Sequence, residues 1–141
     1  MIMKEDFVTY DIAVKLKEKG FKEKCFAYYY PKGSGLIFNH NQFRGGIVED
    51  CLYSNNSLPN ECMASDFVDA PTIPQVLKWF RKEKKLHIVC PFYQDVGYFY
   101  YVQEVGSAAR IVSSFEYSDD CYEHYEQAAL VGIKYVIDNL I

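Results

Sequence analysis

The stretch PTIPQVLKWFRKEKKLHI, residues 71–88, holds a helix start, a helix and the beginning of a strand. Thr72 followed by Gln75 has the spacing of a capping box, in which two side chains satisfy free backbone donors of the first helical turn. After this start, apolar residues recur at the helical period and fall in one sector, namely Ile73, Val76, Leu77 and Phe80. The stretch therefore predicts a helix that buries one face, with Trp79 at its rim, and a strand from Leu86.

On the N-terminal side, the helical spacing of Val8, Ile12, Ala13 and Leu16 predicts a helix over residues 7–19, which Gly20 ends. The short aromatic run over residues 25–30 stops at Pro31 and predicts a strand. Residues 31–70 form a loop-rich insert, in which apolar islands predict at least one short hairpin. The islands are Leu36-Ile37-Phe38, Ile47-Val48 and Cys51-Leu52-Tyr53, and we expect disorder only near residues 55–60.

On the C-terminal side, three strand-like runs over residues 86–92, 98–105 and 110–115 are separated by turn residues that suit antiparallel hairpins. Ser118-Asp119-Asp120 supplies capping side chains for a last helix that runs to about residue 139. Gly132 in this helix indicates close packing against the sheet. The chain is predicted to be a single α+β domain over residues 1–141, with the order α-β-(insert)-α-β-β-β-α. We expect a mostly antiparallel sheet with about three helices on one face.

The charge distribution limits the classes of partner. The net charge is -4, yet residues 78–85 carry +4, so the remainder carries -8. An acidic total argues against a general binder of nucleic acid or of anionic membranes. The alternative function is a nucleic-acid-associated accessory factor that uses the basic helix 73–85, with phosphate contacts from Arg81, Lys82 and Lys85 and base stacking by Trp79. Cations at a helix C-terminus, however, stabilise the helix by roughly 0.3–1 kcal/mol each without any ligand.

No apolar run reaches the length of a membrane span, and the first residues lack the basic and then apolar order of a signal peptide. We therefore expect a cytoplasmic protein that does not bind membranes. The five cysteines are odd in number and widely spaced, as expected of reduced thiols that pack as small apolar groups.

No catalytic, metal-binding or phosphate-binding motif stands out, so we expect no enzyme activity, no metal and no cofactor. Cys121 and His124 could form an activated thiol pair near a helix N-terminus, although their acidic neighbours disfavour a thiolate. His87 and Cys90 are three residues apart on a predicted strand and so point to opposite faces.

The aromatic residues give the leading hypothesis. Residues 28–30 and 98–101 are rich in tyrosine and send rings to both faces of their strands, including Tyr98 and Tyr100. A sheet with helices on one side needs apolar rings on that side only. The other face requires a cover, which we expect to be the insert first, a second subunit second and a ligand third. The sequence thus favours a non-enzymatic interaction protein, with a homo-oligomer or another protein as partner.

Three segments carry a resemblance, namely APTIPQVLKWFR at residues 70–81, the last helix at 125–141, and TYDIA through LKEKGF within residues 9–21. They resemble a group of short uncharacterised proteins of Gram-negative gut anaerobes and of their phages and mobile elements. Because the group has no assigned activity, the resemblance implies a bacterial or phage accessory protein and supplies no functional residues.

Overall fold

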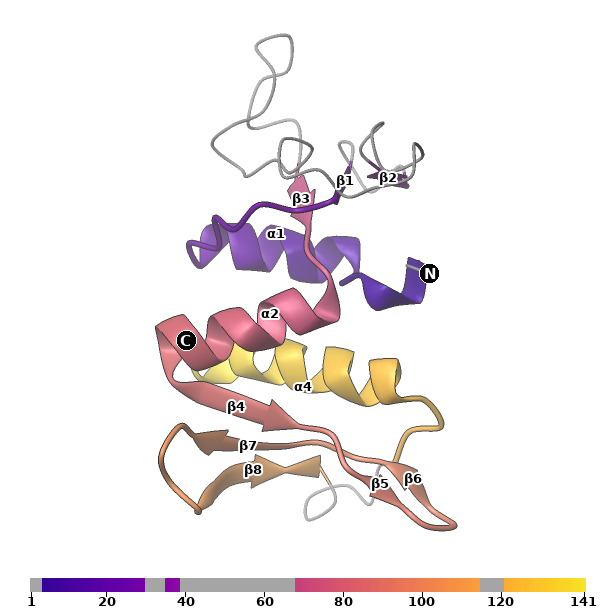
Figure 1. The fold of residues 1–141 in the computed structure, drawn as a ribbon, viewed down its shortest axis with the longest axis vertical. Helices are drawn as coiled ribbons and strands as arrows, with labels where there is room; N and C mark the ends of the chain where they lie inside the picture. Colours follow the sequence, from indigo (N-terminus) through magenta and orange to yellow (C-terminus); the bar gives the residue numbers. More distant parts are fainter. Residues whose placement is uncertain (1–3, 30–34, 39–67, 115–120) are drawn as a thin grey trace, which may run out of the picture. The chain divides into compact units, whose positions relative to one another are not determined.

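The computed structural model describes residues 4–29, 35–38, 68–114 and 121–141, which divide into two compact units. The first unit lies within Met1–Thr72 and the second within Ile73–Ile141. Each unit combines helices with strands, and all strand pairs in these ranges are antiparallel (Figure 1). The α+β prediction is therefore confirmed, while the single domain stays a prediction.

The first unit packs one helix on one sheet. Its elements are η1 (Lys4–Asp6), α1 (Tyr10–Glu18), β1 (Ala27–Tyr29), β2 (Leu36–Phe38) and β3 (Val68–Ala70), with the sheet order β2-β1-β3. Helix α1 packs against β3 and buries Ile12, Ala13 and Leu16, as predicted. Gly20, with a φ of 91°, follows the helix end, where only glycine is unstrained.

The start of α1 differs from the predicted residue 7. Phe7 forms an antiparallel bridge with Thr72, and the Val8 N–H donates to the Pro71 carbonyl at 3.1 Å. Thr9 is extended, with φ -72° and ψ 163°, so the helix begins only at Tyr10. Val8 is buried, but in an extended segment instead of on the helix.

Strand β1 lies within the predicted run 25–30 and is the central strand of its sheet. The Leu36–Phe38 island forms β2, but it pairs with β1 outside the insert, from Ala27↔Phe38 to Tyr29↔Leu36, so the hairpin expected within residues 31–70 stays a prediction. Tyr29 is buried, and its hydroxyl donates to the Val8 carbonyl at 2.6 Å. The islands at 47–48 and 51–53 and the expected disorder near 55–60 lie outside the described residues.

The second unit begins with α2 (Ile73–Trp79), which starts directly after Thr72, as predicted. The chain then widens into a π-helical turn, η5 (Phe80–Lys84), and ends at Lys85, whose φ of 56° is left-handed. The predicted apolar stripe of this helix is buried. Five strands and the helix α4 (Tyr125–Asn139) follow. The strands are β4 (Leu86–Val89), β5 (Phe92–Tyr93), β6 (Gly97–Tyr98), β7 (Tyr101–Glu104) and β8 (Arg110–Ser113).

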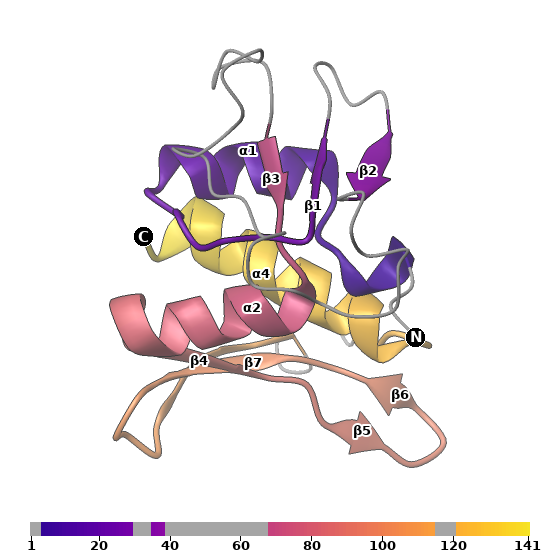
Figure 2. The same ribbon diagram turned by 45° about the horizontal axis from the view of Figure 1, so that its top comes forward.

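The predicted single sheet is divided here. Strands β4, β7 and β8 form one sheet in the order β4-β7-β8, and β5 and β6 form a separate hairpin. The predicted strand 98–105 splits because Tyr98 pairs with Phe92, whereas Tyr101 pairs with Val89 of β4. Figure 2 shows α2 and α4 on the same side of β4 and β7, as the predicted helix layer requires.

Helix α4 approaches its sheet closely at Gly132. A Cβ atom there would lie 3.0 Å from Ile88 Cγ2 and 3.1 Å from the Tyr100 ring, so only glycine fits without a shift. The predicted close packing at this glycine is confirmed. The helix ends at Asn139, as predicted, but starts later than expected. Its N-cap is His124, whose backbone N–H donates to Gln127 Oε1 at 3.2 Å, and the proposed cap at 118–120 lies outside the described residues.

None of the helices in the described ranges combines the length and apolar character that crossing a bilayer requires.

Candidate interaction surface

Among the described residues of the second unit, the β5–β6 hairpin carries the two most exposed large apolar side chains, Phe92 and Tyr93, and Val96, which is as exposed as Val105 elsewhere. Phe92 is 61% exposed, Tyr93 55% and Val96 51%. Both ribbon views show this hairpin extending away from β4 and β7 (Figures 1 and 2). Contiguous exposed apolar groups mark interaction sites more often than isolated ones do. We call Phe92, Tyr93, Val96, Tyr98 and Tyr125 the hairpin surface.

Turn chemistry places the hairpin surface. Asp95 has a φ of 66° and Gly97 a φ of 125°, so the chain reverses over the predicted turn residues 94–97. A Cβ atom on Gly97 would lie 2.6 Å from the Tyr122 carbonyl oxygen. At that point Tyr98 and Tyr122 exchange two backbone hydrogen bonds, of 2.7 and 2.6 Å. This bridge fixes the segment before α4 against the hairpin and brings Tyr125 beside it.

Edge-to-face contacts hold the exposed rings in place. The centroids of Phe92 and Tyr98 are 5.1 Å apart, and those of Tyr98 and Tyr125 are 6.0 Å apart with an interplanar angle of 81°. Such pairs contribute about 0.5–1.5 kcal/mol beyond area burial. Because the rings support one another, the hairpin surface loses little side-chain freedom when a partner covers it.

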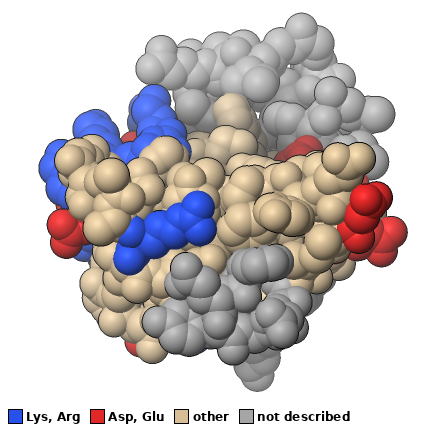
Figure 3. All heavy atoms as spheres, turned by 90° about the horizontal axis from the view of Figure 1, so that it is seen from below, with Lys and Arg blue, Asp and Glu red and all other residues tan. Residues whose placement is uncertain are grey.

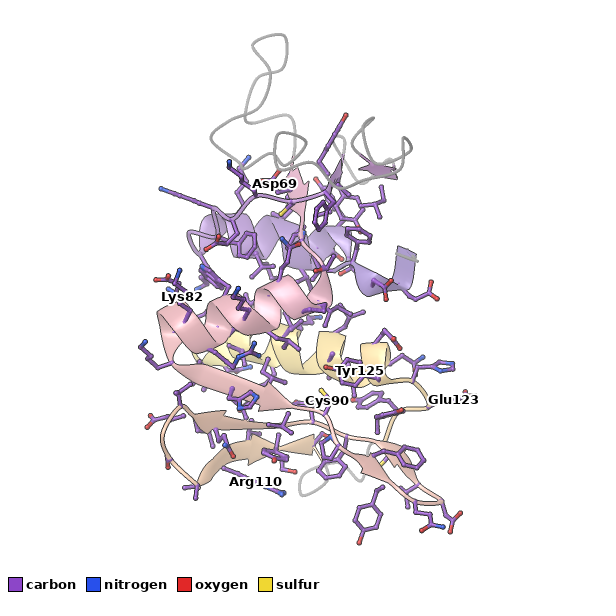
Figure 4. The ribbon with its side chains drawn as sticks, viewed as in Figure 1. Asp69, Lys82, Cys90, Arg110, Glu123 and Tyr125 are labelled. Atoms are coloured by element: carbon purple, nitrogen blue, oxygen red, sulfur yellow. The ribbon has the colours of Figure 1, made fainter. Side chains whose placement is uncertain are left out.

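Tyr125 also faces the interior of the second unit. Burial, together with the nearby Cys90 and Glu126, raises the pKa of its phenol, and Arg81 opposes the shift. Figure 4 shows Tyr125 beside Cys90. Burial raises the pKa of the Cys90 thiol to about 12, which disfavours the thiolate form.

The two tyrosines predicted for the interaction surface have different positions. Tyr98 is half-buried on the hairpin surface. Tyr100 is buried against α4, with its ring centroid 6.4 Å from that of Tyr135, and burial, then Tyr122 and Tyr135, raises its pKa. Tyr100 is therefore a core residue and offers no ring to a partner.

The sheet face away from the helices is covered in part by its own unit. The Arg110 guanidinium lies 3.9 Å from the centroid of the Tyr101 ring, a cation–π contact. Phe99 packs between Tyr93 and Tyr101, at 6.4 Å from each ring. Figure 3, drawn from the β7 and β8 side, shows a mostly uncharged surface. Of the three expected covers, most of the insert lies outside the described residues, and the second subunit and ligand stay predictions.

The basic helix separates its ring from its charges. Trp79 is only 6% exposed, packs 5.6 Å from Phe80 and has the Lys84 ammonium 5.2 Å above its ring. The Trp79 ring is therefore too buried to stack on a nucleic-acid base. The charged side chains around this core position are exposed, except that of Lys84, which is half-buried. We call Lys78, Arg81, Lys82, Lys84 and Lys85 the basic turn.

The structure gives no further support to an activated thiol at Cys121 and His124. His124 is exposed and is the N-cap of α4, and Cys121 is half-buried before it. Cys25 in the first unit is buried, and burial, then Asp69 and Glu23, raises the pKa of its thiol. Cys25, Cys90 and Cys121 form no disulfide with one another, and Cys51 and Cys62 lie outside the described residues. In the ranges that the structure describes, no group of three or more His, Cys, Asp or Glu residues could hold a metal ion.

Sequence reasoning missed one titratable group in the first unit. Asp69 on β3 is only 3% exposed (Figure 4), and burial raises the pKa of its carboxyl to about 7, although Lys17 on α1 opposes the shift. An acid between the apolar residues Val68 and Ala70 is the one signal that could have indicated this position. Among the carboxyl groups that the structure describes, Asp69 is the one whose pKa is raised into the neutral range.

Comparison of the chain with protein-family models, with curated proteins and with solved structures gives no match. The functional argument therefore rests on the geometry of the two units themselves.

Proposed function

We propose that the chain is a small, cytoplasmic, non-enzymatic interaction protein of bacterial or phage origin that binds a protein partner through the hairpin surface. One observation carries the proposal: Phe92, Tyr93 and Val96 are each more than half exposed on one short hairpin. Aromatic side chains that leave water at an interface supply much of the binding free energy. Full burial of one such ring contributes roughly 1.5–3 kcal/mol.

The structure of the hairpin supports a binding role over a packing defect. Phe92 makes an edge-to-face contact with Tyr98 and Tyr93 makes one with Phe99, and Tyr98 is tied to Tyr122 by two backbone hydrogen bonds. Apolar groups that are both exposed and fixed in position are what an interface needs before its partner arrives. Binding a protein partner requires no covalent reaction, so this role does not involve Cys121 and His124.

Co-purification tests the proposal. A tagged wild-type chain should retain a stoichiometric protein from cells that express it, either another protein or a second copy. The double variant Phe92→Ser/Val96→Ser should lose it, whereas Val131→Ser, at an exposed apolar position on α4, should keep it. Equal retention by the wild type and the double variant, with both folded by circular dichroism, would reject the hairpin surface as the binding site.

A second candidate function uses the basic turn. Arg81, Lys82 and Lys85 are exposed within five residues, which suits contacts to phosphates of a nucleic acid. Binding to DNA or RNA would be salt-dependent and lost in Arg81→Glu/Lys82→Glu/Lys85→Glu. No detectable binding at ~50 mM salt, where phosphate contacts are strongest, would remove this candidate.

A further inference from the structure

The second unit separates its charges along its length. The basic turn carries five cations, whereas residues 86–133 contain seven acidic residues and one basic residue, Arg110. Three of these acids lie outside the described residues, and Glu104 pairs with Leu86 beside the basic turn. Asp95, at the hairpin turn, and Glu123, before α4, are exposed beside the hairpin surface. Figure 4 shows Glu123 and Tyr125 at one end of this unit and Lys82 at the other. The unit therefore has an apolar end with acidic borders and a basic end.

These two ends complement each other chemically. Lys and Arg side chains lay their methylene stems on apolar groups while their charged heads stay hydrated or meet a carboxylate. Cations also bind the faces of Phe and Tyr rings, by about 0.5–1 kcal/mol at exposed sites. The methylene stems of the Lys and Arg side chains in the basic turn can thus pack on Phe92 and Tyr93, while their charged groups pair with Asp95 and Glu123.

The basic turn and the hairpin lie at opposite ends of β4, because β4 starts directly after Lys85 and leads to Phe92, although Arg81 still acts on the Tyr125 phenol within one copy. Six residues lie between Lys85 and Phe92, and four of them form β4, which spans about 13 Å at roughly 3.3 Å per strand residue. Two copies placed side by side in opposite directions would bring each basic turn against the other copy's hairpin surface. Both contacts then form at once, as a two-fold symmetric interface requires.

We propose that the occupant of the hairpin surface is the basic turn of a second copy of this chain, in a closed, reciprocal pair. The inference rests on the proposed function, because it assigns a partner to the same surface. In this inference the basic turn binds an acidic and aromatic protein surface, whereas in the second candidate function it binds the phosphates of a nucleic acid.

Charge reversal gives a direct test by sedimentation of the purified chain. Wild type should form a pair whose dissociation constant rises with salt. Lys82→Glu/Lys85→Glu lowers the charge of residues 78–85 from +4 to 0 and places two new carboxylates opposite Asp95 and Glu123, and Asp95→Lys/Glu123→Lys makes both ends basic. Each double variant alone should pair about tenfold or more weakly.

Mixing the two double variants should restore the pair, because the new glutamates of one variant meet the new lysines of the other in one contact, and the unchanged ends meet in the second contact. The matched control Lys22→Glu/Lys134→Glu reverses two exposed cations outside the basic turn and should pair like wild type. Restored pairing in the mixture supports the inference, and its absence overturns it.

The failures of the two proposals can be separated. A wild-type chain that is monomeric at every concentration overturns the self-pairing inference. If Phe92→Ser/Val96→Ser still loses a different co-purified protein, the proposed function stands without it. If neither a pair nor a hairpin-dependent partner is found, both proposals fail.

Discussion

The basic turn and the hairpin surface treat their aromatic residues in opposite ways. In the basic turn the ring of Trp79 is 6% exposed and the charges around it face solvent. In the hairpin surface the rings of Phe92 and Tyr93 face solvent and the backbone bridge to Tyr122 lies beneath them. The conspicuous tryptophan is therefore a structural residue, and the rings available to a partner belong to a short hairpin.

Substitution of Trp79 should lower the free energy of unfolding more than substitution of Gly132 or Phe92. Trp79→Ala removes a buried ring that packs on Phe80, so the free energy of unfolding should fall by about 3–5 kcal/mol. Urea unfolding followed by circular dichroism measures the change. A loss below about 1 kcal/mol would mean that Trp79 does not hold the basic turn.

Asp69 extends the contrast between buried and exposed groups to the first unit. Its raised pKa means that the folded state holds a proton that the unfolded state releases above about pH 4. Its contribution should therefore lower the free energy of unfolding by roughly 2 kcal/mol between about pH 5 and pH 7. Asp69→Asn should remove this loss, so the variant should gain stability relative to wild type as the pH rises.

Chemical unfolding of Asp69→Asn and wild type at several pH values measures that difference. Asp95→Asn is the matched control, because it makes the same change on an exposed turn, where substitutions usually stay within about 0.5 kcal/mol. A difference between Asp69→Asn and wild type that does not change with pH would contradict burial as the cause of the shift.

Gly132 tests the packing that supports the sheet behind the hairpin. In Gly132→Val, the added atoms would meet Ile88 and Tyr100 at about 3 Å, so the free energy of unfolding should fall by about 1–3 kcal/mol. Thermal unfolding would show it. The control is Val131→Ala, on the exposed side of α4. Gly106→Val is unsuitable as a control, because the φ of 90° at Gly106 strains any side chain.

Phe92 should show the smallest effect on folding. Phe92→Ser removes a ring that is 61% exposed and has one aromatic neighbour, so the free energy of unfolding should change by no more than about 1 kcal/mol. The same urea experiment compares it with Trp79→Ala. If the two substitutions destabilised the chain equally, Phe92 would be a core residue and the hairpin surface would lose its meaning.

Local patterns predicted the elements that depend on local chemistry. The start after Thr72 and the buried stripe of α2 follow from side chains within or next to their own helix. Gly132 was recognised from the glycine itself, although the residues it contacts, Ile88 and Tyr100, are distant in sequence. Val8 was assigned to a helix because its spacing fits, yet its N–H bonds to Pro71, a partner distant in sequence. Such a pairing leaves no local periodic signal.

The candidate site was harder to predict for the same reason. The strand 98–105 was split because Tyr98 pairs with Tyr122, a contact that the alternating apolar pattern does not contain. A uniform helical wheel put Trp79 at the rim, but the chain widens from Phe80, so that wheel no longer holds at the junction. Asp69 was missed because a three-residue strand does not reveal which face the helix α1 covers.

Site-specific photo-cross-linking tests the central claim most directly. A photoreactive side chain would replace Val96 on the hairpin or Val131 on α4, two exposed valines of the second unit. In cells that express the chain, the hairpin position should give one discrete protein adduct, of twice the chain's mass if the partner is a second copy, and Val131 should give none. Adducts of equal yield at both positions, or an adduct at Val131 alone, would contradict the assignment of the hairpin surface as the binding site.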